Sequence, residues 1–159
     1  MGKSPTNPDP TASTVTLVVR RAIRATPERL FDAWTVPEQL KKWWGPASVT
    51  CIDATVDLRV GGRYRIANQF PDGKVVWIAG EFEAIERPKR LVYTWRLGPT
   101  DGPPERLTVT FEARGQGTEI VVTHERIPNS AMRDMHEQGW FGCLDGLAEF
   151  VSTDARGGA

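Results

Sequence analysis

The feature that most constrains the fold of this chain is an amphipathic segment near its C-terminus, from about Asn129 to Ser152. Its apolar and aromatic residues recur at intervals of three and four, which places them on one face of a helix. The stripe comprises Met132, His136, Trp140, Cys143, Leu144, Leu147 and Val151. Gly139, beside the stripe, predicts a close approach by a strand or a loop. Such a helix buries its stripe against a large apolar surface.

That surface is predicted to be a β-sheet, because much of the preceding chain alternates with a period of two or is rich in β-branched residues. The expected strands are Val15–Ile23, Val49–Val56, Arg63–Phe70, Val75–Ile85, Arg90–Leu97, Arg106–Ala113 and Thr118–Arg126. Turn-forming sequences such as Pro71-Asp72-Gly73-Lys74 favour hairpins between neighbouring strands. Hairpins predict an antiparallel meander. A sheet wrapped around a helix tends to leave a gap, so the pattern also predicts a cavity.

Two short helices are expected between the first strand and the second. Thr26 suits the N-cap and Pro27 the first helical position of one helix, and Val36-Pro37-Glu38 begins the next in the same way. Proline at the junction predicts a bent pair of helices. The predicted fold class is therefore α+β: a curved antiparallel sheet of six to seven strands wrapped around a long C-terminal helix, with two short helices after the first strand.

Charge and composition exclude several classes of function. The 159 residues include 20 Lys plus Arg and 20 Asp plus Glu, which gives a formal net charge of zero. This balance argues against nucleic-acid binding, and no apolar run approaches the ~20 residues that span a bilayer. We expect a cytoplasmic protein, monomeric or homodimeric. We further expect a disordered tail over residues 1–13, one domain over 14–153 and a flexible tail over 154–159.

The cysteines and histidines form no catalytic or metal-binding motif. Cys51 and Cys143 are expected to be buried thiols, and no spacing of cysteine and histidine is typical of a zinc site. Strand alternation turns His124 inward, toward Trp140 or Cys143. A nucleophile and base pair of Cys143 with His124 is disfavoured, because nothing near Cys143 lowers the pKa of its thiol. We predict no catalytic nucleophile, no metal and no cofactor.

Motifs spread over about residues 15–152 resemble one family. They are Thr26–Trp34, Pro37–Leu40, Trp43–Pro46, Gly61–Tyr64, Gly80–Phe82, Pro88–Trp95, Leu107–Phe111 and Gly139–Trp140. In this order they resemble the START-like helix-grip superfamily, and within it the branch related to the activator of Hsp90 ATPase, in its small stand-alone bacterial form. The resemblance implies a seven-stranded sheet that grips the C-terminal helix, with an apolar cavity between them. It does not specify a function, since the superfamily includes carriers, cyclases and co-chaperone domains.

Residues from the helix pair, the inner faces of the strands and the helical stripe are expected to line this cavity. They are Trp43, Trp44, Tyr64, Ile66, Asn68, Ile78, Phe82, Tyr93, Trp95, Val109, His124, Met132, His136, Trp140, Cys143 and Leu144. The alternative for most of them is ordinary core packing, because aromatic residues dominate burial. One of Trp43 and Trp44 is expected to face outward. Asn68, as a buried amide that needs partners, is a possible ligand anchor.

The function predicted from these features is binding of a small apolar or aromatic molecule in the cavity, oriented by polar groups such as Tyr64, Asn68 or His124. One alternative is an enzyme similar to polyketide cyclases, which would need His124, His136 or Tyr64 as its titratable group. Another is an Hsp90-linked co-chaperone or other protein-interaction domain, which would need an exposed docking patch.

Overall fold

Seven antiparallel strands and three helices make up the fold. The computed structural model describes residues 14–45, 48–98 and 103–158, with side chains as far as residue 152. The strands are β1 (Val15–Ile23), β2 (Thr50–Val56), β3 (Arg63–Gln69), β4 (Val75–Glu86), β5 (Arg90–Leu97), β6 (Glu105–Arg114) and β7 (Gly117–Ile127). The helices are α1 (Pro27–Thr35), α2 (Pro37–Trp43) and α3 (Ser130–Gly158). The predicted fold class is confirmed, and the expected tail over residues 1–13 lies outside the described residues.

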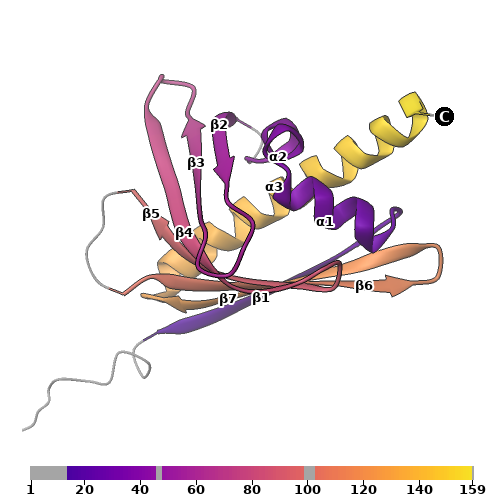
Figure 1. The fold of residues 1–159 in the computed structure, drawn as a ribbon. Helices are drawn as coiled ribbons and strands as arrows, with labels where there is room; N and C mark the ends of the chain where they lie inside the picture. The colour runs from indigo at the N-terminus through magenta and orange to yellow at the C-terminus, as the bar shows by residue number, and fades with distance from the viewer. Residues whose placement is uncertain (1–13, 46–47, 99–102, 159) are drawn as a thin grey trace, which may run out of the picture.

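The strand order in the sheet is β1-β7-β6-β5-β4-β3-β2 (Figure 1). Strands β2 to β7 form the predicted meander, in which each strand pairs with the next along the chain. β1 joins this meander at β7, so Val19 lies opposite Val122. The two strands that flank α1 and α2 therefore form opposite edges of the sheet, and the helix pair spans the space between them.

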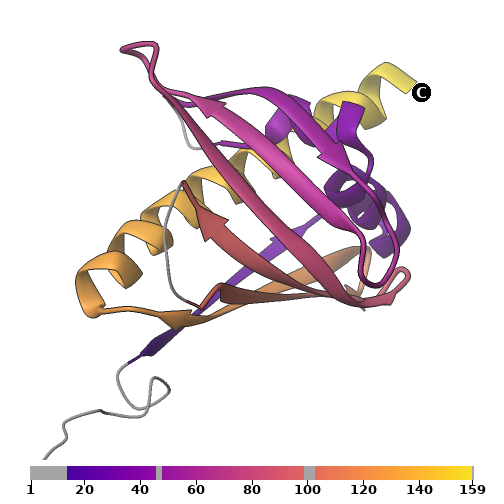
Figure 2. The ribbon, with the colours of Figure 1, turned by 60° about the vertical axis from the view of Figure 1, so that its left-hand side comes forward.

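The sheet curves around α3, which runs along its concave side (Figure 2). A β-bulge in β4 between Phe82 and Ala84 adds local twist. The backbone of Thr94 and the ring of Tyr64 approach β4 closely at Gly80. A Cβ atom there would lie 1.9 Å from the carbonyl oxygen of Thr94 and 2.8 Å from the ring of Tyr64. Only glycine fits at this position of β4.

The core lies between the concave face of the sheet and the apolar stripe of α3. Alternate residues of the strands point inward, as predicted for β6 and β7. The fully buried side chains of this core include Leu17, Leu107, Val109, Ile120 and Val122 from the strands and Leu144 and Leu147 from α3. Each large apolar side chain buried in this way contributes about 1.5–3 kcal/mol. Val109 and Leu144, which were candidate cavity residues, belong to this core.

The helix pair is anchored by its caps and by two tryptophans. The side chain of Thr26 accepts a hydrogen bond from the backbone N–H of Arg29 at 3.1 Å, which confirms the predicted N-cap. The indole N–H of Trp43 donates to the carbonyl of Ala33 at 2.8 Å and fixes α2 against α1. Trp43 and Trp44 are both buried, so the expectation that one of them faces outward is wrong.

The last helix is longer than expected. The side chain of Asn129 accepts from the backbone N–H of Met132 at 2.9 Å, and the helix continues to Gly158 instead of ending at Ser152. The flexible tail expected from residue 154 stays a prediction. Although α3 has 29 residues, no helix in the described part of the chain is both long and apolar enough to cross a membrane.

The helix pair packs on the C-terminal half of α3. The Cβ position of Gly146 lies 2.7 Å from the carbonyl oxygen of Trp43, and the guanidinium of Arg29 lies 4.9 Å from the ring centroid of Phe150. The close approach predicted at Gly139 is wrong, since no heavy atom lies within 4 Å of its Cβ position in the described residues. The close contact is thus two turns later, and the first turns of α3 extend beyond the helix pair.

This difference between two glycines of one helix predicts opposite effects of the same substitution. Alanine is favoured over glycine in a helix interior by about 1 kcal/mol. Gly139→Ala should therefore raise the free energy of unfolding by up to about that amount. Gly146→Ala should lower it by about 1–2 kcal/mol, because the added methyl group meets the Trp43 carbonyl. Urea denaturation of both variants measures this, and equal shifts in the two would contradict the packing of α2 on α3.

Candidate functional site

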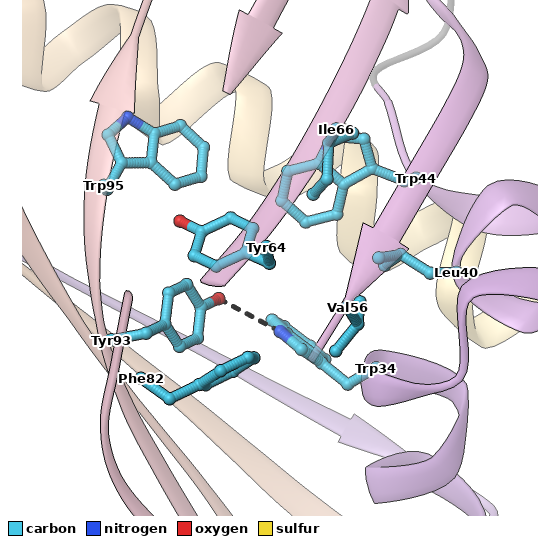
Figure 3. Close-up of a pocket in the computed structure, with 9 residues that line it drawn as sticks. All are labelled: Trp34, Leu40, Trp44, Val56, Tyr64, Ile66, Phe82, Tyr93 and Trp95. Carbon is cyan, nitrogen blue, oxygen red and sulfur yellow. Dashed lines mark hydrogen bonds between the residues drawn. The ribbon is translucent and has the colours of Figure 1, made fainter. Parts of the chain in front are cut away.

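Where the helix pair covers the concave face, aromatic rings close the space between sheet and helices (Figure 3). The lining residues are Trp34, Leu40, Trp44, Val56, Tyr64, Ile66, Phe82, Tyr93 and Trp95. The remaining volume is about 20 Å³, enough for about one water molecule. The indole N–H of Trp34 donates to the Tyr93 hydroxyl at 3.0 Å, and the Tyr64 hydroxyl donates to the carbonyl of Thr94 at 2.6 Å. This inner space is packed core.

A larger pocket of about 430 Å³ opens beside the first turns of α3. Its lining is mainly apolar and comes from α3, from β3, β4 and β5, and from the segment that follows α2. The lining residues are Trp44, Val49, Asn68, Phe70, Ile78, Trp95, Leu97, Met135, His136, Gln138, Gly139, Trp140 and Cys143. Below, this space is called the mouth pocket. It lies beside the part of α3 that precedes the contacts of Trp34 and Trp44 with Trp140.

The mouth pocket contains the polar atoms that the core leaves unpaired. Among the described residues, the buried side-chain atoms without a hydrogen-bond partner are Oδ1 of Asn68, Nε1 of Trp95 and Nε2 of His136. All three residues line this one pocket. In Figure 3 the indole nitrogen of Trp95 lies on the side of the ring away from Tyr64. Because unpaired buried polar groups are rare and costly, their occurrence on residues of one pocket wall indicates a site for polar ligand atoms.

Behind the pocket, a carboxylate holds two stacked histidines. Glu105 is the first residue of β6 and lies opposite Trp95 in the β5–β6 register. Its Oε1 lies 2.6 Å from Nε2 of His124 and 3.2 Å from Nε2 of His136. The second distance suits a hydrogen bond but the angle does not, so Nε2 of His136 counts as unpaired. The two imidazoles are nearly parallel, with centroids 4.6 Å apart.

The hydrogen bonds assign the protons in this cluster. The indole N–H of Trp140 can only donate, and it lies 3.1 Å from Nδ1 of His124, so Nδ1 accepts and the proton of neutral His124 is on Nε2. Burial lowers the pKa of His124, although Glu105 opposes this effect. Burial would raise the pKa of Glu105, but hydrogen bonding to His124 and contact with His136 outweigh it and lower that pKa to about 2. Glu105 is therefore a carboxylate beside a neutral His124.

The same proton assignment bears on metal binding. The ligand atoms of Glu105, His124 and His136 lie within 4.8 Å of one another, which is the spacing of a cation site. A histidine ligand binds a metal through one nitrogen while the other donates its proton to an acceptor. His124 has the reverse arrangement, because Trp140 donates to its Nδ1 and its Nε2 carries the proton. The three residues fit a hydrogen-bond network and do not fit a metal centre.

Cys143 lines the mouth pocket but is not poised as a nucleophile. Burial raises the pKa of its thiol to about 12, so the thiolate is not available near neutral pH. Cys143 and Cys51 are both free and buried, as the sequence predicts. Burial likewise raises the pKa values of Tyr64 and Tyr93, which excludes the Tyr64 hydroxyl as an acid or base near neutral pH.

The structure divides the sequence-predicted cavity residues into three groups. The mouth pocket receives Trp44, Asn68, Ile78, Trp95, His136, Trp140 and Cys143. The packed inner space receives Tyr64, Ile66, Phe82 and Tyr93, together with Trp44 and Trp95, which line both. Trp43, Val109, His124, Met132 and Leu144 line neither space. His124 points inward to Trp140 as predicted, but it lies behind the pocket wall.

Glu105 is the main residue that sequence reasoning missed. It was assigned to no strand, although it has the same alternation parity as the inward residues Leu107 and Val109. Extending the alternation by one position would have found it. The pocket residues Val49, Phe70, Leu97, Met135 and Gln138 were also missed. Of these, Phe70 and Leu97 continue inner-face series that the sequence contains.

A comparison with known families agrees with this architecture. The sequence model of the family described as "Activator of Hsp90 ATPase homolog 1-like protein" matches residues 24–152. The chain belongs to this family. The resemblance found in the sequence motifs is thereby confirmed. No curated protein matches the chain significantly.

Solved structures of bacterial proteins share the fold of this family member. A protein from Chromobacterium violaceum is 28% identical, with a TM-score of 0.79 over 86% of this chain and 96% of its own. A protein from Rhizobium leguminosarum is 29% identical, with a TM-score of 0.74 over 88% and 95% of the two chains. A protein of the family from Silicibacter pomeroyi, 22% identical, has the same fold with a TM-score of 0.79 over 88% and 99%.

The lowered pKa of Glu105 predicts a specific dependence of stability on pH in this family member. Because the pKa of Glu105 is about 2 in the folded state against 4.5 for an unperturbed glutamate, ionised Glu105 stabilises the fold above pH 4.5, and this contribution is lost as the pH falls toward 2. The stability advantage of the wild type over Glu105→Gln should shrink by about 2 kcal/mol between pH 6 and pH 3. Urea denaturation at a series of pH values measures it.

Glu112→Gln provides the matched control for that measurement. Glu112 lies on the same strand, β6, but it is exposed and pairs with Arg114 at 2.9 Å. An exposed pair of this kind contributes little. The difference between wild type and Glu112→Gln should stay nearly constant over the same pH range. A constant difference for Glu105→Gln as well would contradict the network around Glu105.

Proposed function

We propose that this protein binds a small, mainly apolar or aromatic molecule in the mouth pocket. The observation that carries the proposal is the presence of two unpaired polar atoms, on Asn68 and Trp95, in the wall of one mainly apolar space. A volume of about 430 Å³ lies within the range of pockets that bind small organic molecules. The apolar walls would supply the burial energy, and the polar atoms would set the orientation.

The unpaired atoms define the polar chemistry of the ligand. The indole N–H of Trp95 can only donate, so it requires an acceptor such as a carbonyl or phenol oxygen. The amide of Asn68 can pair with a donor or an acceptor, according to its orientation. A flat molecule with an oxygen at one edge and an apolar body therefore fits the pocket better than a pure hydrocarbon, which would leave both groups unsatisfied.

Exposed apolar side chains lie at the rim of this pocket. Phe70, which follows β3, is 40% exposed, and Met135 on α3 is 63% exposed, although both also line the pocket. They lie on opposite sides of the space, on the sheet and on the helix. Entry of an apolar molecule between them would bury surface that is otherwise in contact with water, which favours binding.

The proposal predicts that removing the polar group of Asn68 weakens ligand binding without lowering the stability of the fold. Asn68→Leu replaces the amide by an apolar side chain of similar size, so the free energy of unfolding should stay unchanged or rise by up to about 1 kcal/mol. Binding of oxygen-bearing aromatic compounds such as 2-naphthol should weaken about tenfold, as expected for one lost hydrogen bond. Titrations followed by NMR and by tryptophan fluorescence measure the dissociation constants.

Trp77→Phe is the control for the tryptophan signal. Trp77 lies on the outer face of β4, where the guanidinium of Arg65 is 4.2 Å from its ring centroid. Its replacement should leave both the binding and its fluorescence response unchanged, whereas Trp95→Phe should weaken binding. If no compound in a panel of aromatic alcohols and ketones perturbs the NMR signals of the mouth pocket, the proposed function is wrong.

A further inference from the structure

The mouth pocket contains a base and a hydrogen-bond donor placed for proton transfer. Among its described lining residues only His136 and Cys143 carry titratable groups, and burial keeps the Cys143 thiol protonated. His136 is therefore the one described lining residue that offers a basic nitrogen to a ligand. The rings of His136 and Trp95 are nearly perpendicular, with centroids 6.2 Å apart. The two rings are thus in edge-to-face contact in the pocket wall, so a ligand in the pocket can contact both residues.

Glu105 decides which nitrogen of His136 acts as the base. With the carboxylate oxygen 3.2 Å from Nε2, a lone pair on Nε2 would face a negative charge, so neutral His136 carries its proton there. This leaves the lone pair on Nδ1, on a ring that lines the pocket. The angle at Nε2 is poor for a hydrogen bond, as is common for catalytic contacts before substrate binds.

His124 does not compete for this role. Trp140 donates to its Nδ1 and its Nε2 donates to Glu105, so both ring nitrogens of His124 are engaged. Protonation would place an N–H of His124 against the N–H of Trp140. His124 thus holds Glu105 in position and stacks on His136, while His136 alone adjoins the pocket. The histidine nitrogen that none of these contacts engages is therefore on His136, in the pocket wall.

We propose that the mouth pocket catalyses proton transfer at a carbon next to a carbonyl group of its ligand, with His136 as the base and the Trp95 N–H as the oxyanion donor. His136 removes a proton from the α-carbon. The C–H electron pair becomes the C=C bond of the enolate, and the carbonyl π pair moves to the oxygen, which the indole N–H stabilises. The imidazolium then returns a proton to carbon. No oxidant, reductant or second substrate is consumed. This activity rests on the proposed function.

The test is deuterium incorporation into aromatic ketones in D₂O, followed by NMR and mass spectrometry. The compounds are 2-tetralone, 2-indanone and 4-phenyl-2-butanone, which combine an apolar aromatic body with exchangeable α-hydrogens. The wild type should raise the exchange rate of at least one bound ketone about 10²-fold or more over buffer. His136→Gln should return the rate to that of buffer. Trp95→Phe should lower the rate at saturating ketone about 10²-fold, because it removes the oxyanion donor.

Glu105 is a positioning residue, and its variant is tested by a separate readout. Glu105→Gln should lower the exchange rate at saturation about tenfold or more without changing the dissociation constant of the ketone. The ¹⁵N chemical shifts of His136 should move from a single Nε2–H tautomer toward a mixture. Glu112→Gln on the same strand should change neither quantity, and Trp77→Phe should exchange at the wild-type rate.

The outcomes distinguish this inference from the proposed function. Binding of a ketone in the pocket with exchange no faster than in buffer overturns the inference and leaves the binding function in place. Wild-type exchange by a folded His136→Gln variant overturns it as well, because the base is then another group. If none of the three ketones binds, the binding function fails for this ligand class, and the inference fails with it.

Discussion

The burial of one face of α3 in the concave side of the sheet is the contact on which the other features depend. It fixes the curvature that Gly80 and the bulge in β4 allow. It also fixes where space remains. The helix pair contacts the C-terminal half of α3, where the carbonyl of Trp43 meets Gly146. Around the first turns the side chains of α3, of the sheet and of the segment after α2 leave the mouth pocket open. The mouth pocket is therefore a consequence of how far α1 and α2 reach.

The tryptophans have different roles on the two sides of this boundary. Trp43 contacts both Trp34 and Trp44 in the core, and the indole N–H groups of Trp34 and Trp43 are satisfied by Tyr93 and Ala33. Trp95 lines both the packed region and the pocket, and its N–H is unpaired. Because a satisfied indole stabilises the core and an unsatisfied one destabilises it, the unpaired group is the one that points to function.

The network Trp140–His124–Glu105–His136 joins structure to chemistry. Trp140 and His124 are fully engaged, so they hold an ionised carboxylate at the start of β6 without titrating near neutral pH. His136 is the member left without a hydrogen bond at Nε2, and it lines the pocket together with Trp140. Trp140, His124 and Glu105 are thus held by their mutual hydrogen bonds, and His136 lies where a ligand would bind. The same assignment makes the cluster a poor metal site.

The sequence by itself determined the secondary structure, because alternation, caps and turn residues act over a few neighbouring positions. The Thr26 cap, the six hairpin-linked strands and the stripe of α3 could all be predicted from such local patterns, with most strand ends within one residue. Only the tertiary structure decided which aromatic residues fill the core and which border the pocket. It placed β1 against β7, and it set Glu105 opposite Trp95 and beside two histidines from β7 and α3. These contacts join residues far apart in the chain, so their geometry depends on the sheet curvature and on helix placement, which no local pattern records.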